Sequence, residues 1–252
     1  MRVPTPREHA VGPALRLGAL GAGLLVSLVV YTTINLTMAD TLPTRVLPTA
    51  IDGWVPFQPA WIVVYLGIYA LAITPACLLT DRRYLARGAL AYLLLLLSGV
   101  PFWVFWPVTV PRSPVPVTDL FTWGVALMRF VDPPANCLPS MHVGETVLAA
   151  LLVWPLHRRA GLVIAGLAAM VWWSTLALDQ HWFVDGLAVA IAAVGAWFVA
   201  FRVRPLPESA HGARSLRWLA WAGLLYAAQF LAAALPWWLS LVPPEAIGAV
   251  SG

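Results

Sequence analysis

Residues 181–201, HWFVDGLAVAIAAVGAWFVAF, decide the fold. They open with a histidine and an aspartate, and residues 186–201 then contain no charged side chain. A helix of about twenty such residues, rising 1.5 Å per residue, crosses a hydrocarbon core roughly 30 Å thick. The stretch therefore predicts a transmembrane helix with polar chemistry at its first turn.

The rest of the chain repeats this apolar pattern. Of 252 residues, 61% are hydrophobic and 10% are charged, whereas soluble domains carry about 25% charged residues. Six further apolar runs lie at about 17–38, 60–79, 88–106, 142–157, 160–178 and 218–241. We expect an all-α, polytopic membrane helix bundle with six core transmembrane helices and a seventh. It forms a single membrane-embedded domain, 1–252, with a catalytic core at about 50–201 and an extra C-terminal span at about 218–241.

Two segments between these runs have their own patterns. Residues 107–119, PVTVPRSPVPVTD, are rich in proline, which predicts an extended chain without helix. Residues 120–132, LFTWGVALMRFVD, predict a short helix that lies at the membrane interface with its aromatic side chains at headgroup depth.

Arginine placement predicts the orientation. The chain has no lysine, and all 15 basic residues are arginines. With the N-terminus inside, twelve of them face the cytoplasm, as the positive-inside rule expects. The three that face outward are Arg45, Arg112 and Arg129. This pattern predicts a multi-pass protein of the inner (plasma) membrane, and the composition is typical of a bacterium. The net charge of +4 follows from these clusters and does not indicate a nucleic-acid partner.

Two polar stretches then fall on the external side. In a helix beginning near His181, Asp185 follows at i+4 on the same face, where its carboxylate can bond one ring nitrogen and raise the basicity of the other. Ser140 and His142 precede the run at 142–157. Ser140 is expected to be an N-cap, and the unpaired amides of that helix start predict an anion site.

Together these residues predict phosphoryl transfer. His181 is expected to be the nucleophile, Asp185 its orienting partner and His142 the acid. Arg112 or Arg129 could supply a guanidinium fork for phosphate oxygens. Glu145 either lines the same pocket or complements the helix N-terminus. Plain loop and capping roles are expected for Asn136, Asp179 and Gln180.

The two stretches resemble a known family. LPSMH (138–142) followed by STLALDQHWFVD (174–185) is similar to the type 2 phosphatidic acid phosphatase superfamily, whose later signatures read P-S-x-H and S-R-x5-H-x3-D. The resemblance implies His181 as nucleophile, Asp185 as its partner and His142 as the general acid for the leaving oxygen. It also implies Ser140 and Ser174 as phosphate ligands.

The chain departs from that family at two points. Thr175 stands in the place of the signature arginine, and the upstream K-x6-R-P signature is missing, with PVTVPRSP offering only Arg112. The Ser-Thr variant with HWFVD, and AIDGWVPFQPAWIVVY (50–65), look more like the inositol phosphorylceramide synthase branch. That branch implies a lipid phosphate or phospholipid substrate, a possible hydroxyl acceptor and no cofactor.

The sequence thus predicts a metal-independent lipid phosphatase or phosphotransferase that acts at the outer membrane face through a phosphohistidine. Two alternatives stay open. One is a metal-dependent membrane hydrolase with His142, His181 and Asp185 as ligands. The other is a non-enzymatic protein that binds or transports lipid.

Overall fold

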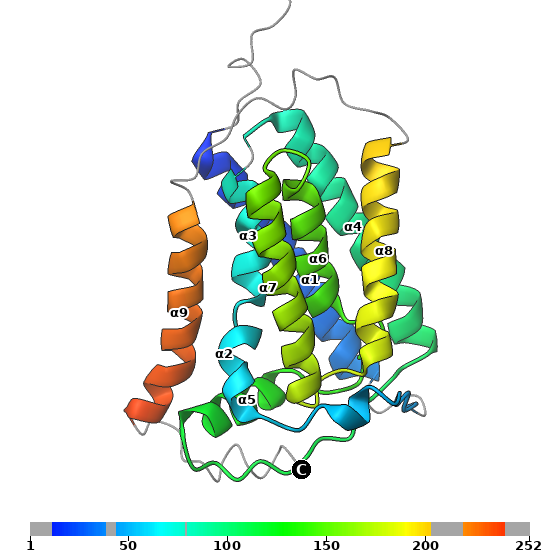
Figure 1. Ribbon diagram of the computed structural model, residues 1–252, viewed down its shortest axis with the longest axis vertical. Helices are drawn as coiled ribbons and strands as arrows, with labels where there is room; N and C mark the ends of the chain where they lie inside the picture. The colour runs from blue at the N-terminus through cyan, green and yellow to red at the C-terminus, as the bar shows by residue number, and fades with distance from the viewer. Residues whose placement is uncertain (1–11, 39–43, 79, 203–218, 240–252) are drawn as a thin grey trace, which may run out of the picture.

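The computed structural model describes residues 12–38, 44–78, 80–202 and 219–239. Helices dominate this part of the chain (Figure 1). The α-helices are α1 (Pro13–Met38), α2 (Ile62–Tyr65), α3 (Ile68–Leu78), α4 (Arg82–Phe105), α5 (Leu120–Val131), α6 (Met141–Val153), α7 (Arg158–Ala177), α8 (Phe183–Arg202) and α9 (Leu219–Trp238). Two single-turn 3-10 helices, η2 (Asp52–Trp54) and η3 (Pro59–Trp61), precede α2.

The all-α membrane bundle predicted from the sequence is confirmed. Within the described residues, five helical segments are long and apolar enough to cross a membrane: Pro59–Leu78, Arg82–Phe105, Arg158–Ala177, Phe183–Arg202 and Ala220–Trp238. Shorter apolar helices lie at Leu25–Thr37, Leu120–Val131 and Met141–Val153. The chain is an integral multi-pass membrane protein.

One span differs from its expected form. The run at 60–79 was expected to be one helix, but it is divided into α2 and α3 at Leu66 and Gly67. At this break the Gly67 amide bonds back to the carbonyl of Val64 at 2.9 Å. The break ends α2 at Tyr65, whose hydroxyl reaches the candidate site described below.

Helix α8 packs mainly through small side chains, as helices in lipid commonly do. On α8 the buried residues recur every three or four positions, which places them in one stripe along the helix: Asp185, Gly186, Val189, Ala193, Ala196 and Ala200. This stripe faces the interior, where α4, α6 and α8 share one apolar core. Large side chains elsewhere on α8, such as Ile191 and Phe198, are exposed on the outside of the bundle.

The described polar segments separate to the two ends of the bundle. The start of α4, the α6–α7 connection and the end of α8 lie at one end, whereas α5 and the starts of α6 and α8 lie at the other (Figure 1). Residues 107–118 contain no helix, and α5 forms directly after them, so the predicted helix-free segment and the short helix after it are confirmed. The position of α5 at the membrane interface stays a prediction. An Asp119–Thr122 capping box begins α5. Five of the arginines, at positions 2, 7, 204, 214 and 217, lie outside the described residues.

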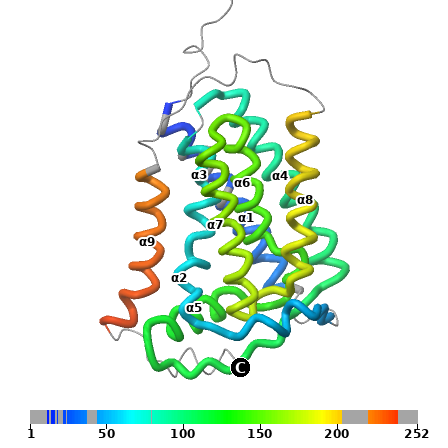
Figure 2. Tube along the Cα trace, in the orientation of Figure 1, coloured from blue at the N-terminus to red at the C-terminus, as the bar shows by residue number. Residues whose placement is uncertain are grey.

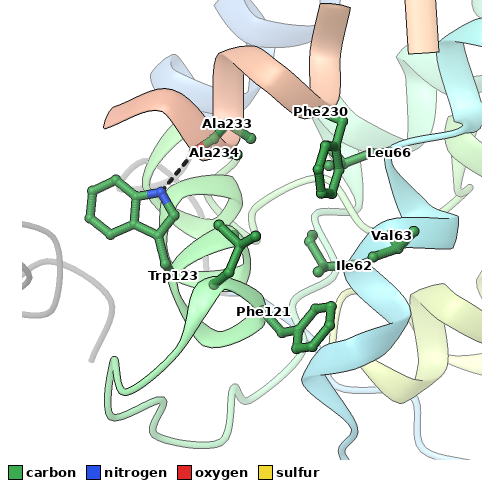
Figure 3. Close-up of a pocket in the computed structure, with 10 residues that line it drawn as sticks. Ile62, Val63, Leu66, Phe121, Trp123, Phe230, Ala233 and Ala234 are labelled. Carbon is green, nitrogen blue, oxygen red and sulfur yellow. Dashed lines mark hydrogen bonds between the residues drawn. The ribbon is translucent and has the colours of Figure 1, made fainter. Parts of the chain in front are cut away.

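Helix α9 runs along the outside of the bundle, beside α3 and above α5 (Figure 2). Figure 3 shows its lower half against α5 and α2, where the Trp123 indole donates to the carbonyl of Ala233 at 2.8 Å. The hydroxyl of Tyr226 donates to the carbonyl of Val63 at 2.8 Å. Pro236 lies inside the last turn of α9.

Candidate active site

The structure brings the two predicted histidines into contact at the end of the bundle that carries α5. Nδ1 of His142 lies 3.2 Å from Nε2 of His181, and both side chains are buried. His142 is in the first turn of α6, and His181 precedes α8 in the turn that follows α7. The backbone carbonyl of Thr175 holds that turn, since it accepts hydrogen bonds from the amides of Gln180 and His181.

The hydrogen-bond partners assign the protons on both rings. Nδ1 of His181 lies 2.9 Å from the carbonyl oxygen of Cys137, which can only accept, so this nitrogen carries a proton. Nε2 of His181 is then an acceptor, and Nδ1 of His142 donates to it. The hydroxyl of Tyr65, 3.2 Å from Nε2 of His142, completes the series by donating. The series leaves the unshared electron pair of His181 on Nε2.

Asp185 supports this arrangement, but not in the predicted way. Helix α8 begins at Phe183, so His181 precedes it, and Oδ2 of Asp185 lies 3.4 Å from Nδ1 of His181. The Cys137 carbonyl is closer to that nitrogen, and Oδ2 of Asp185 also accepts from the amide of Trp182 at 2.9 Å. Asp185 is fully buried, and its Oδ1 has no partner among the described residues. The carboxylate therefore both caps α8 and faces the protonated edge of His181.

Ser140 occupies the predicted N-cap position of α6, but its side chain does not cap the helix. Its hydroxyl is buried and has no hydrogen-bond partner within the described part of the chain. The first amides of a helix have no partner inside the helix, so this end of α6 offers unused donors beside His142. Serine hydroxyls and helix-start amides are suitable ligands for an anion.

The other predicted phosphate ligands are engaged with the protein. Ser174 is fully buried, and its hydroxyl donates to the carbonyl of Val171 at 2.6 Å. Arg112 donates through Nη2 to the carbonyl of Asp132 at 2.7 Å and to the side-chain oxygen of Gln180 at 2.9 Å. Arg112 thus lies next to the residue that precedes His181, and its Nε has no partner among the described residues.

Neighbouring polar residues have structural contacts. The buried Arg129 lies 3.7 Å from the carboxylate of Asp179 and donates to the carbonyl of Leu178 at 3.0 Å. The positive φ of 52° at Asp179 fits the predicted loop role. Glu145 is buried one turn after His142, where its carboxylate accepts from the hydroxyl of Ser27 on α1 at 3.4 Å. Thr175, in place of the family arginine, is fully buried and bonds the carbonyl of Trp172.

The side chains that could together bind a metal differ from the three predicted from the sequence. Among the described residues, donor atoms of Cys137, His181 and Asp185 lie within 4.8 Å of one another, whereas His142 is not part of the group. His142 faces Nε2 of His181 and Asp185 faces Nδ1, so the three predicted ligands do not converge on one point. The Nδ1 that faces Cys137 and Asp185 carries a proton in the series above, and a protonated nitrogen has no electron pair for a metal.

Sequence reasoning missed several residues that border His142. Oδ2 of Asp132 lies 3.9 Å from Nε2 of His142, and α1 contributes Tyr31, whose ring is 6.1 Å from that of His142. Further along the same end, the carboxylate of Asp52 accepts from the amide of Phe183 at 2.7 Å, at the start of α8. The available signal was Asn35, an amide near the end of an apolar run, since polar residues within spans are usually functional.

Comparison with protein-family models, curated proteins and solved structures finds no match for this chain. The similarity to the type 2 phosphatidic acid phosphatase superfamily stays a prediction that depends on residues 138–142 and 174–185. The structure itself shows an integral multi-pass membrane protein with a buried histidine pair at one end.

Proposed function

We propose that this protein is a lipid phosphatase or phosphotransferase that acts on a lipid phosphate or phosphodiester through a phosphohistidine on His181. The observation that carries the proposal is the hydrogen-bonded series from Tyr65 through His142 and His181 to the Cys137 carbonyl. It leaves an electron pair on Nε2 of His181 and places a second histidine directly beside that pair. A nucleophile and an acid are thereby positioned for one reacting atom between them.

The reaction then has two steps. The electron pair on Nε2 of His181 forms a bond to phosphorus, and the bond from phosphorus to the leaving lipid oxygen breaks. That oxygen takes the proton from Nδ1 of His142, which enters the step protonated on both nitrogens and leaves it as a neutral imidazole. Next, water or an acceptor hydroxyl gives its proton to Nδ1 of His142 while its oxygen bonds to phosphorus. The nitrogen–phosphorus bond breaks and returns the electron pair to His181. The substrate phosphate replaces the direct contact of the two rings.

The phosphate oxygens would be bound at the start of α6. The unpartnered hydroxyl of Ser140 and the first amides of α6 are the available neutral donors. Arg112 is the nearest candidate for a positive charge, because its guanidinium bonds Gln180, which precedes His181. Ser174 lies close to the same turn, but its hydroxyl already donates to the carbonyl of Val171, so it would have to give up that bond to bind phosphate. These ligands would do the work of the family lysine and arginine that this chain lacks.

Location supports a lipid substrate. The histidine pair lies at the end of the bundle where α5 and the starts of α6 and α8 meet (Figure 1), with apolar helix faces exposed around it. A lipid headgroup at that depth can reach polar donors while its chains stay in hydrocarbon. The arginine placement in the sequence supports an external position for this end, with the N-terminus in the cytoplasm.

The test uses the purified protein in detergent with excess EDTA. Phospholipids and polyprenyl diphosphates are supplied with and without inositol or diacylglycerol, and free phosphate and new lipids are followed together. We expect turnover that persists in EDTA, a phosphate label on His181, and complete loss in His181→Ala with normal helix content. Turnover by His181→Ala would contradict the proposal, and loss of turnover in EDTA would favour the metal-dependent alternative. Free phosphate indicates hydrolysis, whereas an acceptor-dependent lipid indicates transfer.

A further inference from the structure

The proposed acid, His142, needs a second proton. A neutral imidazole that gives away its proton from Nδ1 becomes an anion, so His142 has to carry protons on both nitrogens when it acts as an acid. In the structure Nε2 of His142 faces two oxygen atoms. The hydroxyl of Tyr65 lies at 3.2 Å and Oδ2 of Asp132 lies at 3.9 Å.

The carboxylate of Asp132 is oriented by helix α1. Its Oδ1 accepts from the hydroxyl of Tyr31 at 3.1 Å and from the side-chain amide of Asn35 at 2.9 Å. Both donors bind the same oxygen, which leaves Oδ2 directed at His142. The two hydrogen bonds to Oδ1 therefore fix the orientation of Oδ2.

The same helix fixes the loop that carries Asp132. Asn35, which is 1% exposed, also donates to the carbonyl of Pro133 at 2.7 Å and accepts from the amide of Ala135 at 3.2 Å. From the opposite side Arg112 donates to the backbone carbonyl of Asp132 at 2.7 Å. Asn35 uses its nitrogen and its oxygen on one short segment, so this segment cannot move far from His142 while α1 is in place.

We propose that Asp132, held by Tyr31 and Asn35 of α1, is a positioning residue that serves as the counter-ion of doubly protonated His142. This inference rests on the proposed function and adds α1 to the machinery, outside the positions that the family signatures cover. Among the described residues, the titratable or charged groups that interact with the pair are Tyr31, Tyr65, Tyr69, Arg112, Cys137 and His181, and Glu145 follows His142 one turn along α6.

Burial and two nearby positive charges set the electrostatics of Asp132. Its side chain is 17% exposed, and burial raises the pKa of its carboxyl, while the charges of Arg112 and His181 oppose that rise. An ionised carboxylate at such a site is costly unless a cation lies beside it. Protonated His142 would be that cation, so each group stabilises the charged form of the other.

The first test needs no substrate. Histidine-labelled protein in detergent is titrated by NMR, and the His142 resonance is assigned with His142→Gln. Asp132→Asn keeps the shape of the side chain and removes its charge. An opposite charge at this distance shifts a titration by about one to three pH units, so we expect the His142 ring to protonate at least about one unit lower in Asp132→Asn. Asp119→Asn, at the other end of α5, is the matched control. In this variant the His142 ring should titrate as it does in the wild type.

The second test uses turnover. We expect Asp132→Asn to lower kcat about 10- to 100-fold on a lipid substrate that the wild type turns over, with KM nearly unchanged. The alkaline limb of kcat/KM should move to lower pH, because His142 loses its proton earlier. Tyr31→Phe, which removes one donor from Oδ1, should shift both measurements in the same direction by a smaller amount, and it serves if Asp132→Asn does not fold.

The outcomes separate the two proposals. An unchanged His142 titration in both Asp132→Asn and Tyr31→Phe overturns the role of Asp132, even where His181→Ala abolishes turnover and the proposed function stands. If Asp132→Asn shifts the His142 titration but the wild type transfers no phosphoryl group from any substrate, the ion pair stands and the proposed function is wrong.

Discussion

Gly186→Ala tests how α8 is seated against the candidate site. A Cβ added at Gly186 would overlap the indole ring of Trp172. That ring cannot easily move away, because it is stacked on Phe183 with ring centroids 4.9 Å apart. Overpacking at such a position typically costs about 1–3 kcal/mol. Gly195, on the same helix, has nothing within 4 Å of an added Cβ, so Gly195→Ala is the matched control.

Both substitutions remove the conformational freedom of glycine in a helix, worth up to about 1 kcal/mol, so their difference isolates the overlap. We expect Gly186→Ala to be less stable than Gly195→Ala by about 1–3 kcal/mol in reversible unfolding with SDS. Activity should fall as well, since the overlap lies next to Asp185. Adding Trp172→Leu to Gly186→Ala should recover much of the difference. Equal stability of the two alanine variants, within about 0.5 kcal/mol, would refute the close packing of α8 on Trp172.

Three further predictions concern single side chains of the site. Ser140→Ala removes a hydroxyl without a partner in the described structure, so stability should change little while KM rises about tenfold, as expected for a lost hydrogen bond to a charged phosphate; an unchanged KM would exclude Ser140 as a ligand. Asp52→Ala should destabilise the protein by about 1 kcal/mol, because the amide of Phe183 loses its cap. Asp52→Asn keeps an acceptor and should not destabilise it, and thermal unfolding of the two variants compares them. Thr175→Arg should lower stability and activity instead of restoring a phosphate ligand, because Thr175 is fully buried; a gain of activity in the same assay would contradict this.

The sequence predicted the features that depend on residues close together in the chain. The runs of apolar residues predicted the helices, and the spacing of His181 and Asp185 predicted their proximity. Arginine placement predicted that His142 and His181 share one end of the bundle, and the structure brings their rings to hydrogen-bond distance. Each of these predictions needs only a helical period or a count of chain crossings.

The residues that were missed depend on contacts far apart in the sequence. Tyr65 reaches His142 across 77 positions, and Tyr31 reaches Asp132 across 101. The helix break after Tyr65 lies at Leu66 and Gly67, inside an apolar run. The helical periodicity of the sequence does not indicate such a break. The position of α1 against the loop after α5 is set by packing, which the pattern of one sequence does not contain.

The two helix starts at the site are used differently, and this difference argues for where an anion would bind. The start of α8 is closed, since Asp52 accepts from the amide of Phe183 and Asp185 accepts from the amide of Trp182. Two carboxylates there repel a phosphate and favour the protonated edge of His181. The start of α6 has no side-chain cap in the described structure, and Ser140 leaves its hydroxyl unpaired. Both helices direct the positive ends of their dipoles to this region, but only α6 has donors to spare. A phosphate bound at α6 would therefore meet Nε2 of His181 from the side away from Asp185, which is the direction that attack on phosphorus requires.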